Sequence, residues 1–429
     1  MHHSYEGLDR AGGTSRDGLL APLRQRDFRL LWAGMCVSLI GDGAFLVALA
    51  WQVYALAGTP SAMGTVGIAM TVPTVVFLLV GGVASDRLDR RRLMLAADAA
   101  RGLAVALLAV LTLTGTLAIW HVIVLVVVYG TGQAFFAPAF DAITPDLLPA
   151  EQLAQANALD QIVRPVALRL AGPALGGVIV GALGAGGAFL LDAASFAISA
   201  AALALMRSRP RRPSDSAASV VDDLRHGWRY IIRHPWLWVT FACATVAYLL
   251  FIGPVEVLVP YVVKTTLHAG AGDLGLVFAA GGLGSIACAL LVGQRGLPRR
   301  GVAFIYVVWT VATLAVAGYG LASAIWQLML VSLVFNLLET AGTIVWSTLK
   351  QQHVPSALLG RVSSLDWLIS IGLVPVSFAL TGPVSEAIGA RETLIGAGLL
   401  GAVFTAAGLL VPAVRNPDRA RDGARLAPA

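Results

Sequence analysis

The sequence predicts an all-α integral membrane protein whose chain crosses the bilayer twelve times. Of its 429 residues, 57% are hydrophobic and only 13% are charged, and the mean hydropathy is +0.78. Apolar runs recur at the length of about 20 residues that a helix needs to cross a hydrocarbon core of about 30 Å. Soluble domains carry about a quarter charged residues, so this composition excludes a water-soluble enzyme.

The predicted spans follow one another with short polar connections. Glycine and proline inside them are compatible with membrane helices, because neighbouring helices satisfy the backbone groups that these residues free. The twelve runs cover residues 29–57, 62–84, 93–115, 119–141, 157–184, 187–206, 236–263, 270–293, 301–322, 326–349, 361–387 and 391–411.

The basic residues predict the orientation. With an even number of crossings, 25 of the 30 lysines and arginines fall on the side that holds both termini. The other side holds Lys264 and Arg391, and Arg101, Arg164 and Arg169 lie within spans. Such asymmetry marks the cytoplasmic side. We therefore expect a multi-pass protein of the cytoplasmic membrane with both termini cytoplasmic. The net charge of +6 then reflects topology, with the lipid bilayer and not nucleic acid as partner.

The chain divides into two halves of six spans each. We expect a cytoplasmic tail over 1–28, halves over 29–206 and 236–411, a cytoplasmic linker over 207–235 and a second tail over 412–429. Residues 149–160 align without gaps on residues 355–366, and a proline, two leucines and an aspartate are identical. Each segment leads into the fifth span of its half, so the halves are predicted to be pseudo-symmetric about an axis along the membrane normal. Within the linker, 220–232 is predicted to form an amphipathic surface helix.

A charged loop joins the second and third spans, with the sequence Gly82-Val-Ala-Ser-Asp86-Arg87-Leu-Asp89-Arg90-Arg91-Arg92. One interpretation is a short loop whose arginines only set the topology. The other is a conformational latch, in which Gly82 lets two helices approach and Asp86 pairs with a positive group in one state.

This loop resembles the signature G-x-L-A-D-R-x-G-R-(K/R) of the major facilitator superfamily, with Ala84 and Asp89 in place of the leucine and the second glycine. The resemblance implies a major facilitator fold, in which two six-helix halves surround a central cavity. It also implies that Asp86, Arg87 and Arg90 form the latch, to which we also assign Gly82 and Arg361.

The fifth span contains a second motif, Gly172-Pro173-Ala-Leu-Gly176-Gly177. Glycines four residues apart allow close helix packing, and this is the plain interpretation. The motif also resembles the G-P-x-x-G-G core found in superfamily exporters that exchange substrate for protons, although Leu168 replaces the usual upstream glycine.

Two further stretches indicate a branch of the superfamily. The first span contains Phe28-Arg-Leu-Leu-Trp-Ala-Gly and Ser38-Leu-Ile-Gly41-Asp42-Gly, and residues 135–149 close the fourth span. Both resemble the branch that contains enterobactin exporters, macrolide efflux proteins and mycobacterial multidrug pumps. The resemblance covers about residues 24–411.

Four ionisable residues within the spans are candidates for proton coupling. Asp42, Arg169 and Glu339 lie nearest the midplane, and Glu256 lies toward the outer end of the seventh span. A charge in the membrane is costly, so such residues face a cavity or a partner. Asp42 and Glu339 are expected to share one cavity, where dry surroundings favour a protonated carboxyl group. The alternative is that each is a hydrogen-bonded packing residue.

Other charged residues in the spans are predicted to be structural. Asp98 with Arg101, and Asp160 with Arg164, have the spacing of ion pairs on one helix. Asp192 is expected to be shallow and solvated.

Aromatic and polar residues of both halves are predicted to line the cavity, although each is also compatible with ordinary packing. They are Tyr54, Tyr129, Gln133, Phe136, Tyr248, Phe251, Asn336 and Trp346.

We expect a secondary active transporter, and not an enzyme, that exports small, largely apolar molecules by proton-coupled alternating access and works as a monomer. Neither Lys264 nor Lys350 lies in a phosphate-binding loop, which argues against ATP as the driver. Cys36, Cys243 and Cys288 are far apart and form no metal motif, so no cofactor or metal is expected.

Three alternative functions remain open. They are a dedicated exporter of a siderophore or another metabolite, an importer, which the glycine motif disfavours, and a membrane-embedded enzyme or sensor.

Overall fold

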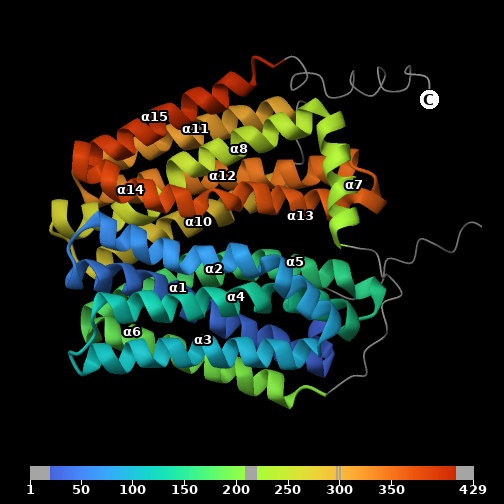
Figure 1. Ribbon diagram of the computed structural model, residues 1–429, viewed down its shortest axis with the longest axis horizontal. Helices are drawn as coiled ribbons and strands as arrows, with labels where there is room; N and C mark the ends of the chain where they lie inside the picture. The colour runs from blue at the N-terminus through green and yellow to red at the C-terminus, as the bar shows by residue number, and fades with distance from the viewer. Residues whose placement is uncertain (1–19, 208–219, 296–297, 299–300, 412–429) are drawn as a thin grey trace, which may run out of the picture.

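The computed structural model describes residues 20–207, 220–295, 298 and 301–411, and within these residues it contains helices and no strand. Figure 1 shows two bundles stacked on one another, with α1–α6 in one and α8–α15 in the other. Residues 1–19 and 412–429 of the predicted tails, and residues 208–219 of the predicted linker, lie outside the described residues.

The N-terminal bundle begins with the short helix η1 (Ala21–Arg24). Its long helices are α1 (Arg26–Leu56), α2 (Pro60–Arg87), α3 (Arg90–Leu113) and α4 (Ile119–Leu147), followed by η2 (Ala150–Gln152), α5 (Leu153–Arg164), the π-helical turn η3 (Pro165–Ala171) and α6 (Gly172–Leu205). The turn between α2 and α3 is made without glycine because Asp89 caps α3, its Oδ1 accepting a hydrogen bond from the Arg92 amide at 3.0 Å. A side-chain oxygen satisfies an amide that the first turn leaves unpaired.

The amphipathic helix α7 (Val220–Arg233) precedes the C-terminal bundle. This bundle comprises α8 (Pro235–Gly253), η4 (Pro254–Leu258), α9 (Val259–Tyr261), η5 (Val262–Thr266), α10 (Ala271–Arg295), α11 (Gly301–Leu321), α12 (Ile325–His353), α13 (Ser356–Gly372), α14 (Val374–Ile388) and α15 (Ala390–Gly408). The π-helical turns η3 and η4 each start at a proline, Pro165 and Pro254. Proline has no amide hydrogen and disturbs the preceding turn, which favours such local unwinding.

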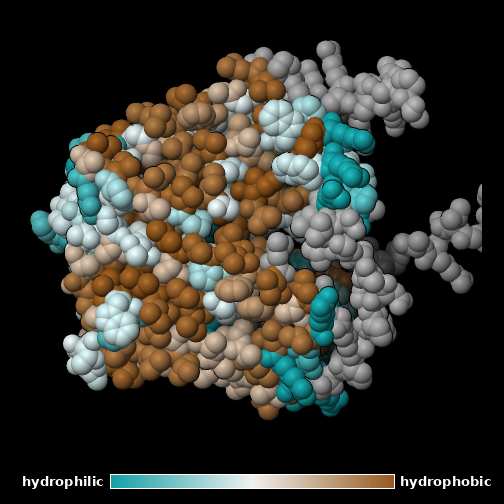
Figure 2. Space-filling view, in the orientation of Figure 1, coloured by the Kyte–Doolittle hydropathy of each residue, from teal (hydrophilic) through white to brown (hydrophobic). Residues whose placement is uncertain are grey.

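The helices have the length and surface of membrane spans. Ten described helices are apolar and long enough to cross a membrane. One of them, Gln155–Leu205, has 51 residues, about 77 Å of helix, which is too long for one crossing. It bends at Gly184, whose φ of 75° only glycine adopts readily, and so forms two spans. With α15, the structure accommodates the twelve predicted crossings. Figure 2 shows a hydrophobic belt between more polar ends.

The two ends of the bundles differ. We call the end with the α2–α3 turn, α7 and the α12–α13 turn the arginine-rich end, since it holds Arg90, Arg229 and Arg361. The opposite end has turns at glycines with positive φ, namely Gly58, Gly115, Gly184 and Gly389. The bundles meet mainly through α2 with α14 and through α6 with α10.

Candidate functional site

A cavity of about 550 Å³ lies inside the C-terminal bundle, beside its interface with the N-terminal one. Along α12 its wall runs from Ser332 to Lys350, which is about 27 Å of helix. The N-terminal bundle contributes four of the lining residues, Leu46, Leu168, Arg169 and Pro173. The volume falls in the range of pockets that bind drug-sized molecules.

Aromatic side chains form much of the cavity wall. Phe251 packs edge-on against Tyr248 and Phe335, with ring centroids 5.4 and 5.3 Å apart. The predicted wall residues Tyr248, Phe251, Asn336 and Trp346 line the cavity. Contrary to the prediction, the wall does not include Tyr54, Tyr129, Gln133 or Phe136.

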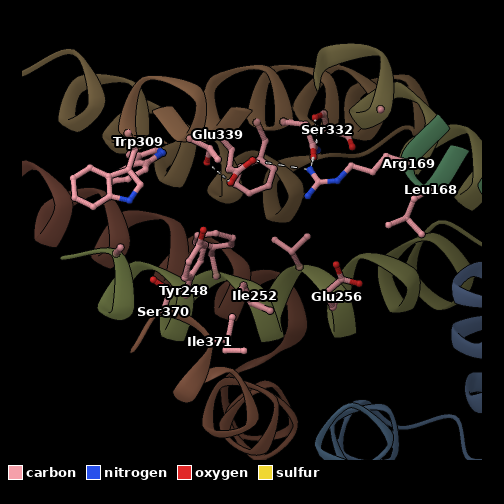
Figure 3. Close-up of a pocket in the computed structure, with 18 of the residues that line it drawn as sticks. Leu168, Arg169, Tyr248, Ile252, Glu256, Trp309, Ser332, Glu339, Ser370 and Ile371 are labelled. Carbon is pink, nitrogen blue, oxygen red and sulfur yellow. Dashed lines mark hydrogen bonds and ion pairs between the residues drawn. The ribbon is translucent and has the colours of Figure 1, made fainter. Parts of the chain in front are cut away.

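Arg169 enters the cavity from the N-terminal bundle and contacts α12. Its guanidinium donates a hydrogen bond to Asn336 Oδ1 at 3.2 Å and lies 4.0 Å from Glu339 Oε2. Figure 3 shows Glu339 and Ser332 on one wall, with Tyr248, Ile252 and Glu256 facing them. The carboxylate of Glu256 is exposed in the cavity and makes no hydrogen bond or ion pair with the other residues that the structure describes.

A second ion pair lies near the arginine-rich end of the cavity. Lys350 of α12 pairs with Asp366 of α13, and Trp346 donates a hydrogen bond to the same carboxylate at 2.9 Å. Neither Lys350 nor Asp366 was predicted from the sequence to belong to the site. Two signals were available, since Lys350 is one of two lysines in the chain and Asp366 ends the repeated segment.

Asp42 lies inside the N-terminal bundle and not in this cavity. Its side chain is 9% exposed, and the Tyr129 hydroxyl donates a hydrogen bond to its Oδ1 at 2.6 Å. The expectation that Asp42 and Glu339 face one cavity is therefore wrong for this conformation. The Asp42 side chain instead faces Tyr129 of α4.

The buried ion pair of Arg101 and Asp98 adjoins Asp42, and its N–O distance is 2.5 Å, as the spacing predicted. Arg101 also donates to Gln133 Oε1 at 2.7 Å, and the Phe136 ring lies 4.5 Å from its guanidinium carbon. Gln133 and Phe136 thus surround a buried charge, which is costly to leave unpaired. The predicted pair of Asp160 and Arg164 also forms, at 3.2 Å.

Asp192 is fully buried, so the expectation of a solvated side chain is wrong. Ser195 donates a hydrogen bond to its Oδ1 at 3.1 Å, whereas Oδ2 has no partner among the described residues. The side chain faces α1 at Gly41, where an added Cβ atom would lie 2.4 Å from Asp192 Oδ1. Counting residues from the span end does not give the direction of the side chain.

The proposed latch residues lie at the arginine-rich end. Arg90 donates hydrogen bonds to Asp146 at 2.5 Å and to the Ala142 carbonyl at 2.9 Å, which ties α3 to the end of α4. The close approach of α2 to α4 occurs at Gly81, where a Cβ would meet the Ala134 carbonyl. Gly82 has open space, so its predicted role in helix approach is wrong for this conformation.

The other proposed latch residues with a place at this end are Arg87, Asp86 and Arg361. Arg87 is exposed, and the side chain of Asp86 lies outside the described residues. Arg361 of α13 packs against α7, where a Cβ on Gly227 would lie 3.1 Å from Arg361 Cβ.

The glycine motif of α6 packs against helices of both bundles. A Cβ on Gly172 would lie 2.7 Å from Gly43 Cα, and one on Gly176 would lie 2.6 Å from Ala44 Cα, both in α1. A Cβ on Gly177 would lie 2.9 Å from Gly275 Cα in α10 of the other bundle. A Cβ on Gly275 would lie 2.6 Å from the Pro173 carbonyl oxygen. The motif therefore serves close backbone packing, both within the N-terminal bundle and between the bundles.

The two bundles are closed against each other toward the opposite end, and we call these contacts the seal. Tyr54 donates a hydrogen bond to the Val257 carbonyl at 2.5 Å. Lys264 donates to the Trp51 carbonyl at 2.9 Å and lies 4.5 Å from the centre of the Trp51 ring. The Phe378 ring fills the space over Gly67. Tyr54, predicted as a cavity residue, thus belongs to the seal.

Two curated relatives align with most of this chain. The macrolide efflux protein A of Streptococcus pyogenes is 22% identical over 378 residues, which is 87% of this chain and 93% of the relative. The multidrug efflux pump Tap of Mycobacterium tuberculosis (strain ATCC 25618 / H37Rv) is 28% identical over 421 residues, 92% of this chain and 95% of the relative.

Solved transporter structures share the fold. A transporter of the POT family, in complex with a thioalcohol-conjugated peptide, matches with a TM-score of 0.70 at 12% identity, over 91% of this chain and 98% of that one. A bacterial homologue of the iron transporter ferroportin, in an inward-facing state, matches with a TM-score of 0.68 at 15% identity, over 90% of this chain and 99% of that one.

The sequence matches the family of transmembrane secretion effectors over residues 17–424. Together with the helical architecture, this match assigns the chain to a multi-pass membrane protein family of transporters and not of enzymes. The protein belongs to the transmembrane secretion effector family of the major facilitator superfamily.

Proposed function

We propose that this protein exports small, largely apolar molecules by proton-coupled alternating access and works as a monomer. The observation that supports this most directly is the aromatic cavity of about 550 Å³, which lies inside the C-terminal bundle beside its interface with the N-terminal one. The names of the efflux relatives support the outward direction of transport. The substrate would bind between the walls formed by Tyr248 and Glu339 and leave after the seal opens.

The arginine-rich end is proposed to be cytoplasmic, with both termini on that side. The cavity lies on this side of the seal, so substrate would enter from the cytoplasm in the described conformation. Opening toward the outside would then separate α2 from α14 and α6 from α10. Asp86, Arg87 and Arg90 are proposed to act as the latch at the cytoplasmic end, with Gly82 and Arg361 beside them.

Two separate groups of carboxyl residues are available for proton coupling. In the cavity, Glu339 lies beside Arg169, and Glu256 faces them. In the N-terminal bundle, Asp42, Asp98 and Asp192 are buried around the single guanidinium of Arg101. Both groups contain carboxyl side chains, which can take up and release a proton. We propose Asp42 and Glu339 as the first residues to test, with Glu256 and Arg169 as further candidates.

The direct test uses everted membrane vesicles in which an inward-directed or outward-directed pH gradient is imposed. Wild-type vesicles should accumulate a fluorescent, largely apolar efflux substrate when their interior is acidic, and a protonophore should abolish the accumulation. If the residue carries the proton, Asp42→Asn or Glu339→Gln should abolish this uphill transport and spare downhill movement.

Full pH-driven transport by both variants would exclude these two residues as proton carriers. Accumulation with the reversed gradient would indicate an importer. A growth-inhibition panel, set against siderophore levels in the supernatant of a deletion strain, would distinguish drug export from dedicated metabolite export.

A further inference from the structure

We propose that Glu256 recognises a positive charge on the substrate, so that the preferred substrates are amphipathic organic cations with one charged group. This inference rests on the proposed function of the cavity as the substrate site. It follows from the charge balance of the cavity, from the way η4 presents Glu256, and from the aromatic surroundings.

The residues that line the cavity include one more carboxylate than they do cations. Five of the lining residues are charged, and two of them are cations. Arg169 lies against Glu339, and Lys350 pairs with Asp366. Glu256 is the remaining one, and no described residue pairs with it. An ionised carboxylate inside a protein is stable only with a partner or with water, so a ligand cation at this position would balance the one carboxylate by which the lining exceeds its cations.

The π-helical turn η4 determines where Glu256 points. Its neighbours Val257 and Leu258 are fully buried, and the Val257 carbonyl accepts the hydrogen bond from Tyr54. These contacts fix η4 against α1, so that Glu256 is exposed on the cavity side. Figure 3 shows its carboxylate projecting into the cavity from the same wall as Tyr248 and Ile252. Unwound turns of this kind are frequent at functional sites.

The surroundings of Glu256 suit a cation with an apolar body. Phe251, Tyr248 and Phe335 form a connected set of rings in the same cavity, and ring faces attract cations that have lost water. Beyond these rings the cavity continues along α12 to Trp346. The charged group would lie at Glu256 and the apolar body along the aromatic wall.

Glu256 also borders the seal, which places it on the route of release. It lines a second, small pocket of about 30 Å³ between the bundles, together with Leu46, Met63 and Phe378. Because Phe378 is part of the seal, separation of α2 from α14 would open this pocket toward the opposite end. A cation bound at Glu256 would then face that end without moving to another site.

The experiment measures binding to the purified full-length protein by quenching of its tryptophan fluorescence. The probes are tetraphenylphosphonium, which is a cation, and triphenylphosphine oxide, which is neutral and similarly aromatic. Glu256→Gln should raise the Kd of tetraphenylphosphonium about tenfold or more, the effect of losing a hydrogen-bonded or paired charge. It should leave the Kd of the neutral probe within about twofold, and Glu256→Asp should restore part of the cation affinity.

The matched control is Glu386→Gln, which removes an exposed carboxylate of α14 that does not line the cavity. It should change neither Kd. Equal weakening of both probes by Glu256→Gln, an unchanged Kd for the cation, or no binding of the cation by the wild type would overturn the proposal. Since binding is measured without a gradient, a protein that binds the cation selectively but does not export it would contradict the proposed function and leave this inference standing.

Discussion

Arg169 of η3 lies 4.0 Å from Glu339 of α12 and joins the two bundles inside the cavity. The same guanidinium donates a hydrogen bond to Asn336 at 3.2 Å. These residues are 167 or more positions apart in the chain and come from opposite halves. If the halves move relative to each other during transport, we expect this interaction across the cavity to change with the conformational state.

Arg169→Gln should have little effect on stability and a clear effect on binding. The Arg169 side chain is 50% exposed, and partly exposed ion pairs contribute about 1 kcal/mol or less. Glu339 would lose its positively charged partner and keep only the hydrogen bond from Thr343, so the Kd of tetraphenylphosphonium should fall several-fold. Thermal unfolding and fluorescence quenching check both outcomes, with Arg169→Lys as the control that keeps the charge. Weaker cation binding by Arg169→Gln would show that Glu339 is not available to a ligand.

Gly177→Ala should weaken the seal. The added Cβ would lie 2.9 Å from both the Ala271 carbonyl and Gly275 Cα, so α6 and α10 would have to separate. Spin labels at the exposed positions Thr59 and Thr265, one in each half, should report longer distances in this variant.

Gly181→Ala is the matched control for this change, because nothing lies within 4 Å of its added Cβ. Its distance distribution should equal that of the starting protein. If Gly177→Ala leaves the distribution unchanged as well, contact at the motif does not determine closure of the opposite end.

Arg101→Met should destabilise the protein strongly. Arg101 is 2% exposed and pairs with Asp98 at 2.5 Å, and removal of one partner of a buried pair costs about 3–5 kcal/mol. Arg164→Met breaks the pair with Asp160, in which the Arg164 side chain is 43% exposed. It should cost about 1 kcal/mol or less. Thermal unfolding and size-exclusion profiles of the two variants compare them directly. Similar unfolding temperatures would mean that the buried network does not support the fold.

Asp86→Asn should retain expression and ligand binding but reduce transport. If Asp86 holds the latch in one state, neutralising it shifts the balance between inward- and outward-open forms. Arg90→Gln should act in the same direction, since Arg90 ties α3 to Asp146 and Ala142. Transport assays in proteoliposomes measure the effect, with binding as the reference. Wild-type transport by a well-expressed Asp86→Asn variant would remove the latch role.

Cysteine labelling should establish the orientation. In a background without Cys36, Cys243 and Cys288, the exposed positions Thr114 and Ser323 of the opposite end are each replaced by cysteine. Both should react with an impermeant maleimide in intact cells, whereas Gln351→Cys at the arginine-rich end should react only after permeabilisation. The reverse pattern would show that the termini are outside the cytoplasm.

Local properties of the sequence were sufficient for the fold class and the superfamily of the protein. Apolar length, which depends only on consecutive residues, identified the spans, and a residue pattern of fixed spacing identified the superfamily. The ion pairs of Asp98 with Arg101 and of Asp160 with Arg164 were also predictable, since residues three or four apart on a helix are neighbours. In each case the partner lies within one turn of the same helix.

The tertiary structure decided which ionisable residues share a site. Residue count along a span gives an expected depth in the membrane, but it does not give the direction of the side chain. Asp42 and Glu339 were therefore expected in one cavity, whereas Asp42 contacts Tyr129 and Glu339 lines the cavity. That direction depends on helix packing, such as the contact of Gly43 with Gly172 that orients α1. The π-helical turns η3 and η4 add to this, because an extra residue in a turn rotates every following side chain around the helix axis. Arg169 and Glu256 lie on these two turns, and their positions in the cavity therefore depend on the packing between helices.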